Sequence, residues 1–280
     1  MTHYVVYDVF TDQVFGGNPL AVILDAGALP EHDLQRIARE FNFSETVFLF
    51  PAENPEHTAK MRIFTPTMEI PFAGHPTIGT AIALADMGTP GEMILELGVG
   101  PIPARVKDGQ ASFTTKVPLK KSGTPDPALV AQCLGLDVDE ITTATHAPQI
   151  ASVGLPFVIT ELTSRDALAR IRTDTDAFRQ GAETWPDSMD FAQLAYVRNA
   201  HMVEARMFAP LDNIPEDPAT GSAAAALGAL LEERLGHSIN LEVSQGVDMG
   251  RPSRIDVHVK EGAITISGTA RRVMSGTLEY

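Results

Sequence analysis

The stretch Arg62-Ile-Phe-Thr-Pro-Thr-Met-Glu-Ile-Pro71 returns later in the chain as Arg206-Met-Phe-Ala-Pro-Leu-Asp-Asn-Ile-Pro215. The arginine, the phenylalanine, the isoleucine and both prolines coincide at a constant offset of 144 residues. At an offset of 142, His75-Pro-Thr-Ile-Gly-Thr-Ala-Ile-Ala then matches Asp217-Pro-Ala-Thr-Gly-Ser-Ala-Ala-Ala. Nine of nineteen aligned positions are identical, which indicates two similarly folded halves.

Each copy of the repeat reads as a strand, a proline-bounded turn and a helix rich in alanine and glycine. A helix with small residues on nearly every face is buried all round. We therefore predict an α+β fold of two pseudo-symmetric lobes, each a mostly antiparallel or mixed sheet wrapped around a central helix. The central helices are expected at 76–86 and 218–235, with a cleft between the lobes that faces both helix N-termini. Ile78, Ala81, Ala223 and Ala224 should be buried.

The segment 118–127 holds three prolines and two lysines, with a glycine and a serine, and is the best candidate for a linker. The predicted organisation is an N-terminal lobe at 1–118, a linker at 119–127 and a C-terminal lobe at 128–280. The last strand is free to return to the N-terminal lobe.

The charge balance restricts the partners. The 280 residues carry a formal net charge of −15, which disfavours nucleic acid and anionic membranes, because both need a basic surface. A small anionic substrate stays compatible, since backbone N–H groups can hold a carboxylate on an acidic protein. No segment approaches the roughly 20 apolar residues that cross a bilayer. No basic region leads into an apolar one near the N-terminus, so no signal peptide is expected.

Signatures of metals and cofactors are missing from the sequence. The single cysteine, Cys133, allows neither an intrachain disulfide nor a cysteine-based metal cage, and a cytoplasmic location is expected. The glycines Gly74 and Gly79 have the spacing of a phosphate-binding loop, but Thr80 stands where its lysine is required. The eight histidines show no metal-ligand spacing. We expect no cofactor and no metal.

His75 and Asp217 occupy equivalent positions in the repeat, and a proline follows each. Proline is favoured at the first helical position, so both residues are predicted at or near an N-cap. Asp217 alone reads as a capping carboxylate, and His75 alone as a polar turn residue. Histidine is a mediocre cap, however, and two titratable groups related by an internal dyad would face each other across the cleft. The functional interpretation is therefore favoured for both.

The two helix N-termini are predicted to bind an anion. Gly74, Gly221 and Ser222 lie at these turns, and glycine lets a ligand approach the backbone. Exposed N–H groups and the helix dipole favour negative charge there. Ser222 could add a hydroxyl donor, with packing inside the helix as the equally weighted alternative.

Glu45 lies between apolar residues, with Phe43 before it and Val47 and Phe48 after it. Carboxylates are seldom buried unpaired. If Glu45 is buried, desolvation raises its pKa and makes it a usable proton carrier near neutral pH. The alternatives are a pairing with Arg62 or Arg39, or simple exposure on one face of a strand.

Several motifs together resemble the phenazine-biosynthesis (PhzF-like) family, in the family's order and over nearly the whole chain. They are Gly17-Asn-Pro19, Asn42-Phe-Ser-Glu-Thr46, Arg62-Ile-Phe-Thr-Pro66, Pro71-Phe-Ala-Gly-His-Pro76, Glu216-Asp-Pro-Ala-Thr-Gly-Ser222, Gln245-Gly246 and Gly250-Arg-Pro-Ser253. The resemblance implies the diaminopimelate-epimerase fold, in agreement with the repeat.

The resemblance also implies the site. Its proton-shuttling glutamate falls on Glu45, and its assisting histidine and aspartate fall on His75 and Asp217. Gly74, Gly221 and Ser222 then fall among the substrate-contacting positions, and Asn18 borders the site. Cys133 lies outside both repeat motifs, which argues against the two-thiol racemisation of the related epimerases.

The predicted function is a cofactor-independent isomerase that moves a proton at carbon in a small carboxylate-bearing substrate, amino-acid-like or dihydroaromatic. An amino-acid epimerase or racemase with carboxylate bases is the alternative enzyme, and a non-catalytic small-ligand binding protein is the alternative outside enzymes. A homodimer is expected.

Overall fold

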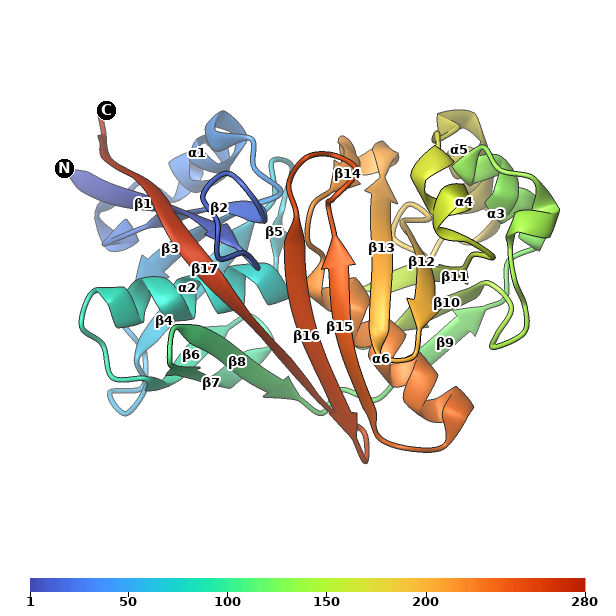
Figure 1. Cartoon of the computed structure of the whole chain (residues 1–280). Coiled ribbons are helices and arrows are strands. Elements are labelled where there is room, and N and C mark those ends of the chain that lie inside the picture. Colours follow the sequence, from blue (N-terminus) through green and yellow to red (C-terminus); the bar gives the residue numbers. More distant parts are fainter. Residues whose placement is uncertain (280) are drawn as a thin grey trace. The chain divides into compact units, whose positions relative to one another are not determined.

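The computed structural model describes residues 1–279, and the chain divides into two compact units (Figure 1). The first unit holds Met1–Thr115 and the chain from Ile266 onward, and the second holds Lys116–Thr265. The last strand therefore ends in the first unit. Residues 119–127, predicted as the linker, instead lie inside the second unit, because Lys120–Gly123 pair with a strand of that unit and Asp126 caps a helix.

The first unit is a mixed sheet in which β17 pairs with β1 and the order continues through β2, β3, β4, β6, β7 and β8. The β2–β3 and β4–β6 pairs are parallel and the others antiparallel. Its elements are β1 (Thr2–Val9), β2 (Asn18–Ile23), η1 (Ala26–Ala28), α1 (Glu31–Phe41), β3 (Glu45–Phe50), β4 (Ala59–Phe64), β5 (Glu69–Ile70), α2 (Gly74–Asp86), β6 (Glu92–Leu97), β7 (Gly100–Lys107), β8 (Gln110–Thr115) and most of β17 (Ala263–Leu278).

The second unit repeats this arrangement. Its strands follow the order β9, β10, β11, β12, β13, β15 and β16, with parallel pairs at β11–β12 and β13–β15. Its elements are β9 (Lys120–Gly123), α3 (Pro127–Leu134), η2 (Val138–Glu140), β10 (Gln149–Ser152), β11 (Pro156–Glu161), α4 (Arg165–Arg170), α5 (Thr175–Thr184), β12 (Gln193–Asn199), β13 (Met202–Ala209), η3 (Pro210–Asp212), β14 (Ile214–Asp217), α6 (Gly221–Leu235), β15 (Ile239–Gln245) and β16 (Ser253–Lys260).

The strand pairings confirm the internal repeat. From β1 to β7, successive pairs alternate antiparallel and parallel, and the same alternation runs from β10 to β16. Short β5 and β14 occupy the same place, each antiparallel to the strand that carries the repeated arginine. The α+β class and the two sheet-plus-helix lobes are as predicted.

Helices α2 and α6 are the central helices. Every residue from Gly74 to Ala83 is buried in α2, and α6 is buried from Ala223 to Leu231. Helix α2 packs against strands β1, β2, β3, β7 and β8, and α6 packs against β10, β11, β15 and β16. The buried positions predicted for these helices are confirmed, since Ile78, Ala81, Ala223 and Ala224 are at most 1% exposed. Both predicted starts were wrong, because α2 begins at Gly74 and α6 at Gly221.

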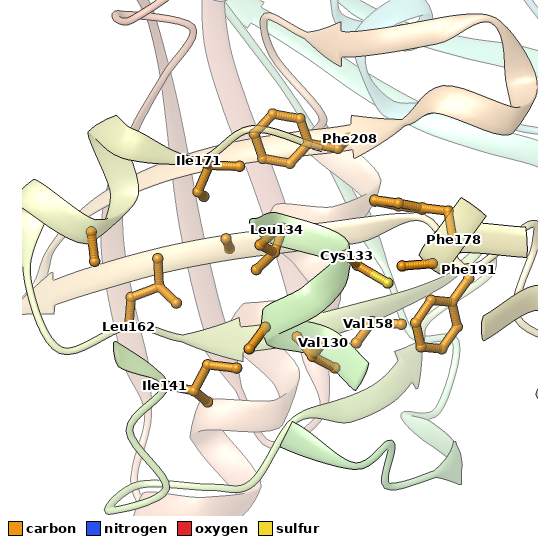
Figure 2. Packing of buried hydrophobic residues seen from close by; sticks show 14 of the residues in the cluster. Val130, Cys133, Leu134, Ile141, Val158, Leu162, Ile171, Phe178, Phe191 and Phe208 are labelled. Atoms are coloured by element: carbon orange, nitrogen blue, oxygen red, sulfur yellow. The ribbon is translucent and has the colours of Figure 1, made fainter. Parts of the chain in front are cut away.

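A second layer of helices covers the other face of each sheet. In the second unit, side chains of α3, α4 and α5 pack on Ala195 and Phe208 of the sheet (Figure 2). In the first unit, α1 packs in the same way on Phe48 and Phe64. Helix α5 was not predicted from the sequence, and its only buried residues are Ala177, Phe178 and Gly181. No helix in the described part of the chain is long and apolar enough to cross a membrane.

Candidate active site

In the first unit, the fold brings Glu45 and His75 together. Glu45 is the first residue of β3, and His75 is the second residue of α2. The Oε2 atom of Glu45 lies 3.2 Å from Nδ1 of His75, and the two side chains are only 16% and 4% exposed. The parallel β2–β3 ladder places Glu45 opposite Leu20, so the start of β2 lies beside the pair.

Burial sets the charge of His75. It lowers the pKa of the imidazole to about 3, against the opposite effect of a hydrogen bond with the Pro19 backbone. The ring is therefore neutral near pH 7, and its Nε2 is buried without a hydrogen-bond partner among residues 1–279. A neutral imidazole therefore lies 3.2 Å from the Glu45 carboxyl group.

Asn18 and Gly74 border this pair. Asn18 begins β2, is fully buried and accepts a hydrogen bond from the Ser44 hydroxyl through Oδ1 at 3.3 Å. Gly74 is the first residue of α2, and the N-cap residue Ala73 provides no side-chain cap. His75 therefore lies within the first turn, two residues after the N-cap and close to its predicted place. The N-terminus of α2 keeps its backbone N–H groups without a side-chain acceptor of the capping type.

In the second unit, Asp217 is the last residue of β14 and is 5% exposed. Its ladder partner is Met207, and this pairing keeps Asp217 in the strand. Thr220 is the N-cap residue of α6, so Asp217 lies three residues before the N-cap, and its alternative interpretation as the N-cap residue does not hold. The Thr220 hydroxyl instead donates to Asp217 Oδ2 at 2.5 Å.

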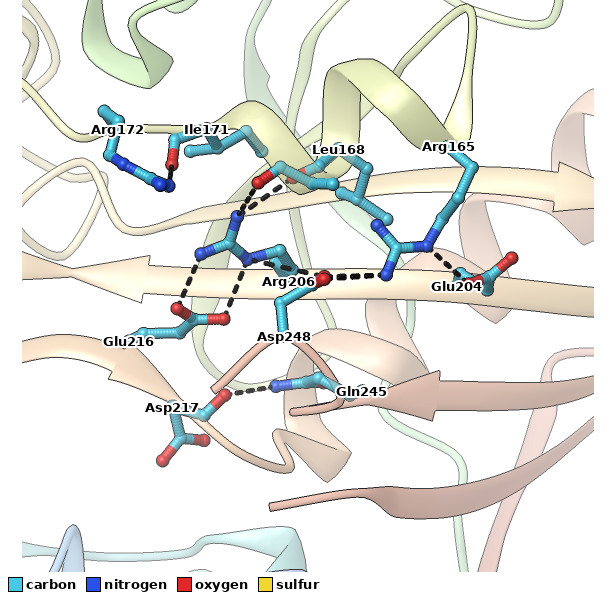
Figure 3. Close-up of polar contacts among 11 residues, drawn as sticks. Arg165, Leu168, Ile171, Arg172, Glu204, Arg206, Glu216, Asp217, Gln245 and Asp248 are labelled. Carbon is cyan, nitrogen blue, oxygen red and sulfur yellow. Dashed lines mark hydrogen bonds and ion pairs between the residues drawn. The ribbon is translucent and has the colours of Figure 1, made fainter. Parts of the chain in front are cut away.

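Gly221 and Ser222 open α6, where the N-cap residue makes no side-chain cap either. Gly221 is buried and Ser222 is half-buried. Thr220 and Gln245 were not predicted as site residues, although both lie in motifs that resemble the family. Gln245 Nε2 donates to the Asp217 backbone carbonyl at 2.8 Å, which Figure 3 shows. The signal that could have indicated them was the presence of a polar side chain, Thr220 or Gln245, in each of two separate motifs.

The two arginines considered as partners of Glu45 bind elsewhere. Arg62, considered above as a partner of Glu45, binds Glu31 and Glu69. Arg39 donates to the Pro66 backbone carbonyl. Among residues 1–279, no three His, Cys, Asp or Glu side chains are grouped as a metal ion would need.

Two sheets, each with a buried helix whose N-terminus lies at a titratable residue, define a two-lobed enzyme of the diaminopimelate-epimerase type. The chain belongs to the phenazine biosynthesis-like protein family, whose model matches residues 7–276. It is similar to an uncharacterized isomerase of Mesorhizobium japonicum, with 38% identity over 99% of this chain and 98% of the relative. It is 32% identical to the trans-2,3-dihydro-3-hydroxyanthranilate isomerase of Pseudomonas aeruginosa, over 99% of both chains.

Solved structures agree. The phenazine biosynthesis protein of the PhzF family from Bacillus anthracis superposes with a TM-score of 0.89 at 25% identity and covers 100% of both chains. The protein is therefore an isomerase of the PhzF family.

Proposed function

We propose that this isomerase moves a proton from one carbon to another in a small carboxylate-bearing substrate, without a cofactor, and that Glu45 carries the proton. One C–H bond is broken as Glu45 accepts the proton, the electron pair moves along the unsaturated system, and a new C–H bond forms at a second carbon. The reaction is redox-neutral and needs no co-reactant.

The contact between Glu45 and His75 carries this proposal. A carboxyl group shielded from water and 3.2 Å from a neutral imidazole can hold a proton briefly and release it again. The unpartnered Nε2 of His75 supports a role of the ring toward substrate, because buried polar atoms are normally hydrogen-bonded. His75 and Asp217 then bind and polarise the substrate.

The helix termini and a relative support a proposed substrate class. The N-termini of α2 and α6 have no side-chain caps, and such ends favour a carboxylate. The relative from Pseudomonas aeruginosa acts on a dihydro-hydroxyanthranilate, a ring that bears an amine and a carboxylate. We propose a cyclic or unsaturated amino acid of this kind, with that compound as the first to test. Gly74, Gly221, Ser222 and Asn18 form its surroundings.

Glu45→Gln tests the proton carrier. Glutamine is nearly isosteric but does not titrate, so turnover should fall by roughly 100-fold or more. Incorporation of solvent deuterium into the carbon skeleton should stop, while substrate binding persists. Glu56→Gln, an exposed glutamate of the same unit, is the matched control and should exchange deuterium at the wild-type rate. If Glu45→Gln also exchanges at that rate, another residue is the base.

The labelled position separates the enzyme classes. Deuterium at a new carbon supports the isomerase, whereas deuterium at the original stereocentre with inversion supports an epimerase. A protein that binds the compound and labels no carbon supports a binding protein.

We further propose a cytoplasmic homodimer. The buried thiol of Cys133 suits a reducing compartment. Sedimentation of the purified chain measures its mass, and metal analysis with an absorbance spectrum checks for metals and flavin.

A further inference from the structure

Three buried side chains of the second unit form a connected hydrogen-bond network. Gln245, Thr220 and Asp217 are 1%, 8% and 5% exposed. Gln245 Nε2 donates to the Asp217 backbone carbonyl at 2.8 Å and to Thr220 Oγ1 at 3.0 Å. Gln245 Oε1 accepts from the Thr220 backbone N–H at 3.3 Å. One amide side chain thus joins the end of β14 to the N-cap of α6.

The number of available protons sets the direction of each bond. Turning the amide over would place Oε1 against the Asp217 carbonyl, so that two acceptors would face each other. Nε2 is therefore the donor to Thr220, and a lone pair of Oγ1 is occupied. The single proton of the Thr220 hydroxyl then points to Asp217 Oδ2 at 2.5 Å. The chain of donors runs from Gln245 through Thr220 to the carboxylate.

The turn between Gln245 and Ser253 is fixed by further contacts. The Ser253 hydroxyl makes hydrogen bonds to the backbone carbonyls of Pro218 at 2.8 Å and Gln245 at 3.0 Å. Gly246 follows with φ +74°, and a Cβ there would lie 2.3 Å from the Arg251 carbonyl oxygen. Asp248, in the same turn, is bound by Arg165, which Figure 3 shows. The Gln245 side chain therefore projects from backbone that this turn holds in place.

We propose that Thr220 and Gln245 are positioning residues that orient the Asp217 carboxylate for the isomerisation. The inference rests on the proposed role of Asp217. The hydroxyl gives Oδ2 a fixed donor, and the amide fixes the backbone from which the carboxylate projects. A carboxylate held in one orientation reaches the productive geometry without further ordering.

Thr220→Val keeps the shape and removes the hydroxyl. It should lower kcat by about 10- to 100-fold, the usual cost of losing a partner that orients a functional group. KM should change much less. Thr220→Ser restores the hydroxyl and should recover most of kcat. Gln245→Glu removes the NH₂ donor and should lower kcat to a similar extent, and it carries the test if Thr220→Val fails to fold.

A double-mutant cycle separates positioning from a general structural role. In the Asp217→Asn background, Thr220→Val should cause no further loss of kcat, because Thr220 acts through Asp217. Equal losses of kcat in both backgrounds, or wild-type kcat in folded Thr220→Val and Gln245→Glu, would overturn the proposal. If Asp217→Asn alone keeps wild-type kcat, the proposed role of Asp217 fails instead, so the two failures are distinguishable.

Discussion

Each unit contains an arginine at the equivalent position of the repeat, but one of the two is more deeply buried than the other. Arg62 and Arg206 each hold a glutamate through Nε and NH2, Glu69 and Glu216 respectively, at 2.6–2.8 Å. Each guanidinium also lies over the phenylalanine two residues on, at 5.2 and 5.0 Å. The Arg62 side chain is 22% exposed, whereas that of Arg206 is 8% exposed.

The remaining donors of the two arginines go to different partners. Arg62 reaches Glu31, the exposed first residue of α1. Arg206 NH1 reaches the backbone carbonyls of Leu168 and Ala169 near the end of α4, where a helix favours positive charge. The repeated arginine and phenylalanine thus form the same stacked pair twice, once near the surface and once inside, although the glutamates come from non-equivalent positions.

The proposed catalytic residues lie at positions where the two copies differ. Thr46 pairs with Phe64 as Gln193 pairs with Phe208, and the two phenylalanines are equivalent in the repeat. Counting back one residue, Glu45 corresponds to Ala192, which is fully buried and carries no acid. His75 likewise corresponds to Asp217. The frame is symmetric, and the proposed proton carrier exists in one unit only.

The largest expected difference between the units concerns the arginines. Arg206→Met removes the arginine from the Glu216 carboxylate, which is only 15% exposed in the wild type, and should lower the free energy of unfolding by about 3–5 kcal/mol. Arg62→Met breaks a more exposed cluster and should cost about 1 kcal/mol or less. Urea unfolding of both variants measures this. Equal losses would contradict the difference in depth.

Asp217→Asn tests the second titratable position. Asparagine keeps the shape but not the charge, and Thr220 rather than Asp217 is the N-cap, so folding should be unchanged. Turnover should fall by roughly 100-fold if the charge serves the reaction. Steady-state kinetics with a thermal melt measure both, and Asp187→Asn, on the surface of the same unit, is the control. Near-normal turnover would return Asp217 to a structural role.

The two units should respond to pH in opposite directions. Burial lowers the pKa of His75 from 6.5 to about 3, so His75 costs stability as pH falls from about 6.5 toward 3. Burial, and then the hydrogen bond and charge of Asp190, raise the pKa of Asp212 from 3.8 to about 6. The contribution of Asp212 is therefore present below pH 3.8 and is lost as pH rises through 6.

Two variants isolate these contributions. Relative to the wild type, His75→Gln should gain stability as pH falls below about 6.5, and Asp212→Asn should gain stability above about pH 6. Each gain is at most about 1.4 kcal/mol per pH unit, and less for the half-buried Asp212. Melting curves between pH 4 and 8 measure both. If the stability of a variant and of the wild type changed with pH in parallel, the substituted residue would not contribute to the pH dependence of stability.

The smallest expected difference concerns helix glycines. A Cβ on Gly79 would lie 2.6 Å from side-chain atoms of both Leu20 and Val9, whereas one on Gly228 would lie 2.8 and 3.0 Å from Val257 and Val259. Overpacking costs about 1–3 kcal/mol, and the helix propensity of alanine returns about 1 kcal/mol. Gly79→Ala should therefore be less stable than Gly228→Ala by roughly 1 kcal/mol in urea unfolding. The reverse order would show that Leu20 and Val9 move aside easily.

The sequence by itself determined the architecture. A repeat of identical residues predicts two similar halves, and helices of small residues must be buried because every face of them is apolar. The family was recognised from short local motifs that occur in the family's order. Each of these signals is local or periodic, so it can be recognised in the amino-acid sequence alone. The helix starts were misplaced because proline marks a boundary only approximately.

Only the tertiary structure decided the partners. Glu45 and His75 are far apart in the chain, and the parallel register of β2 and β3 with the packing of α2 brings them to 3.2 Å. Gln245, at the end of β15, donates to the Thr220 hydroxyl oxygen, and the hydroxyl proton of Thr220 goes to Asp217. The depression of the His75 pKa likewise comes from burial, which no single residue reveals. Contacts between distant segments depend on register and packing together, and these form only when the whole sheet closes around its helix.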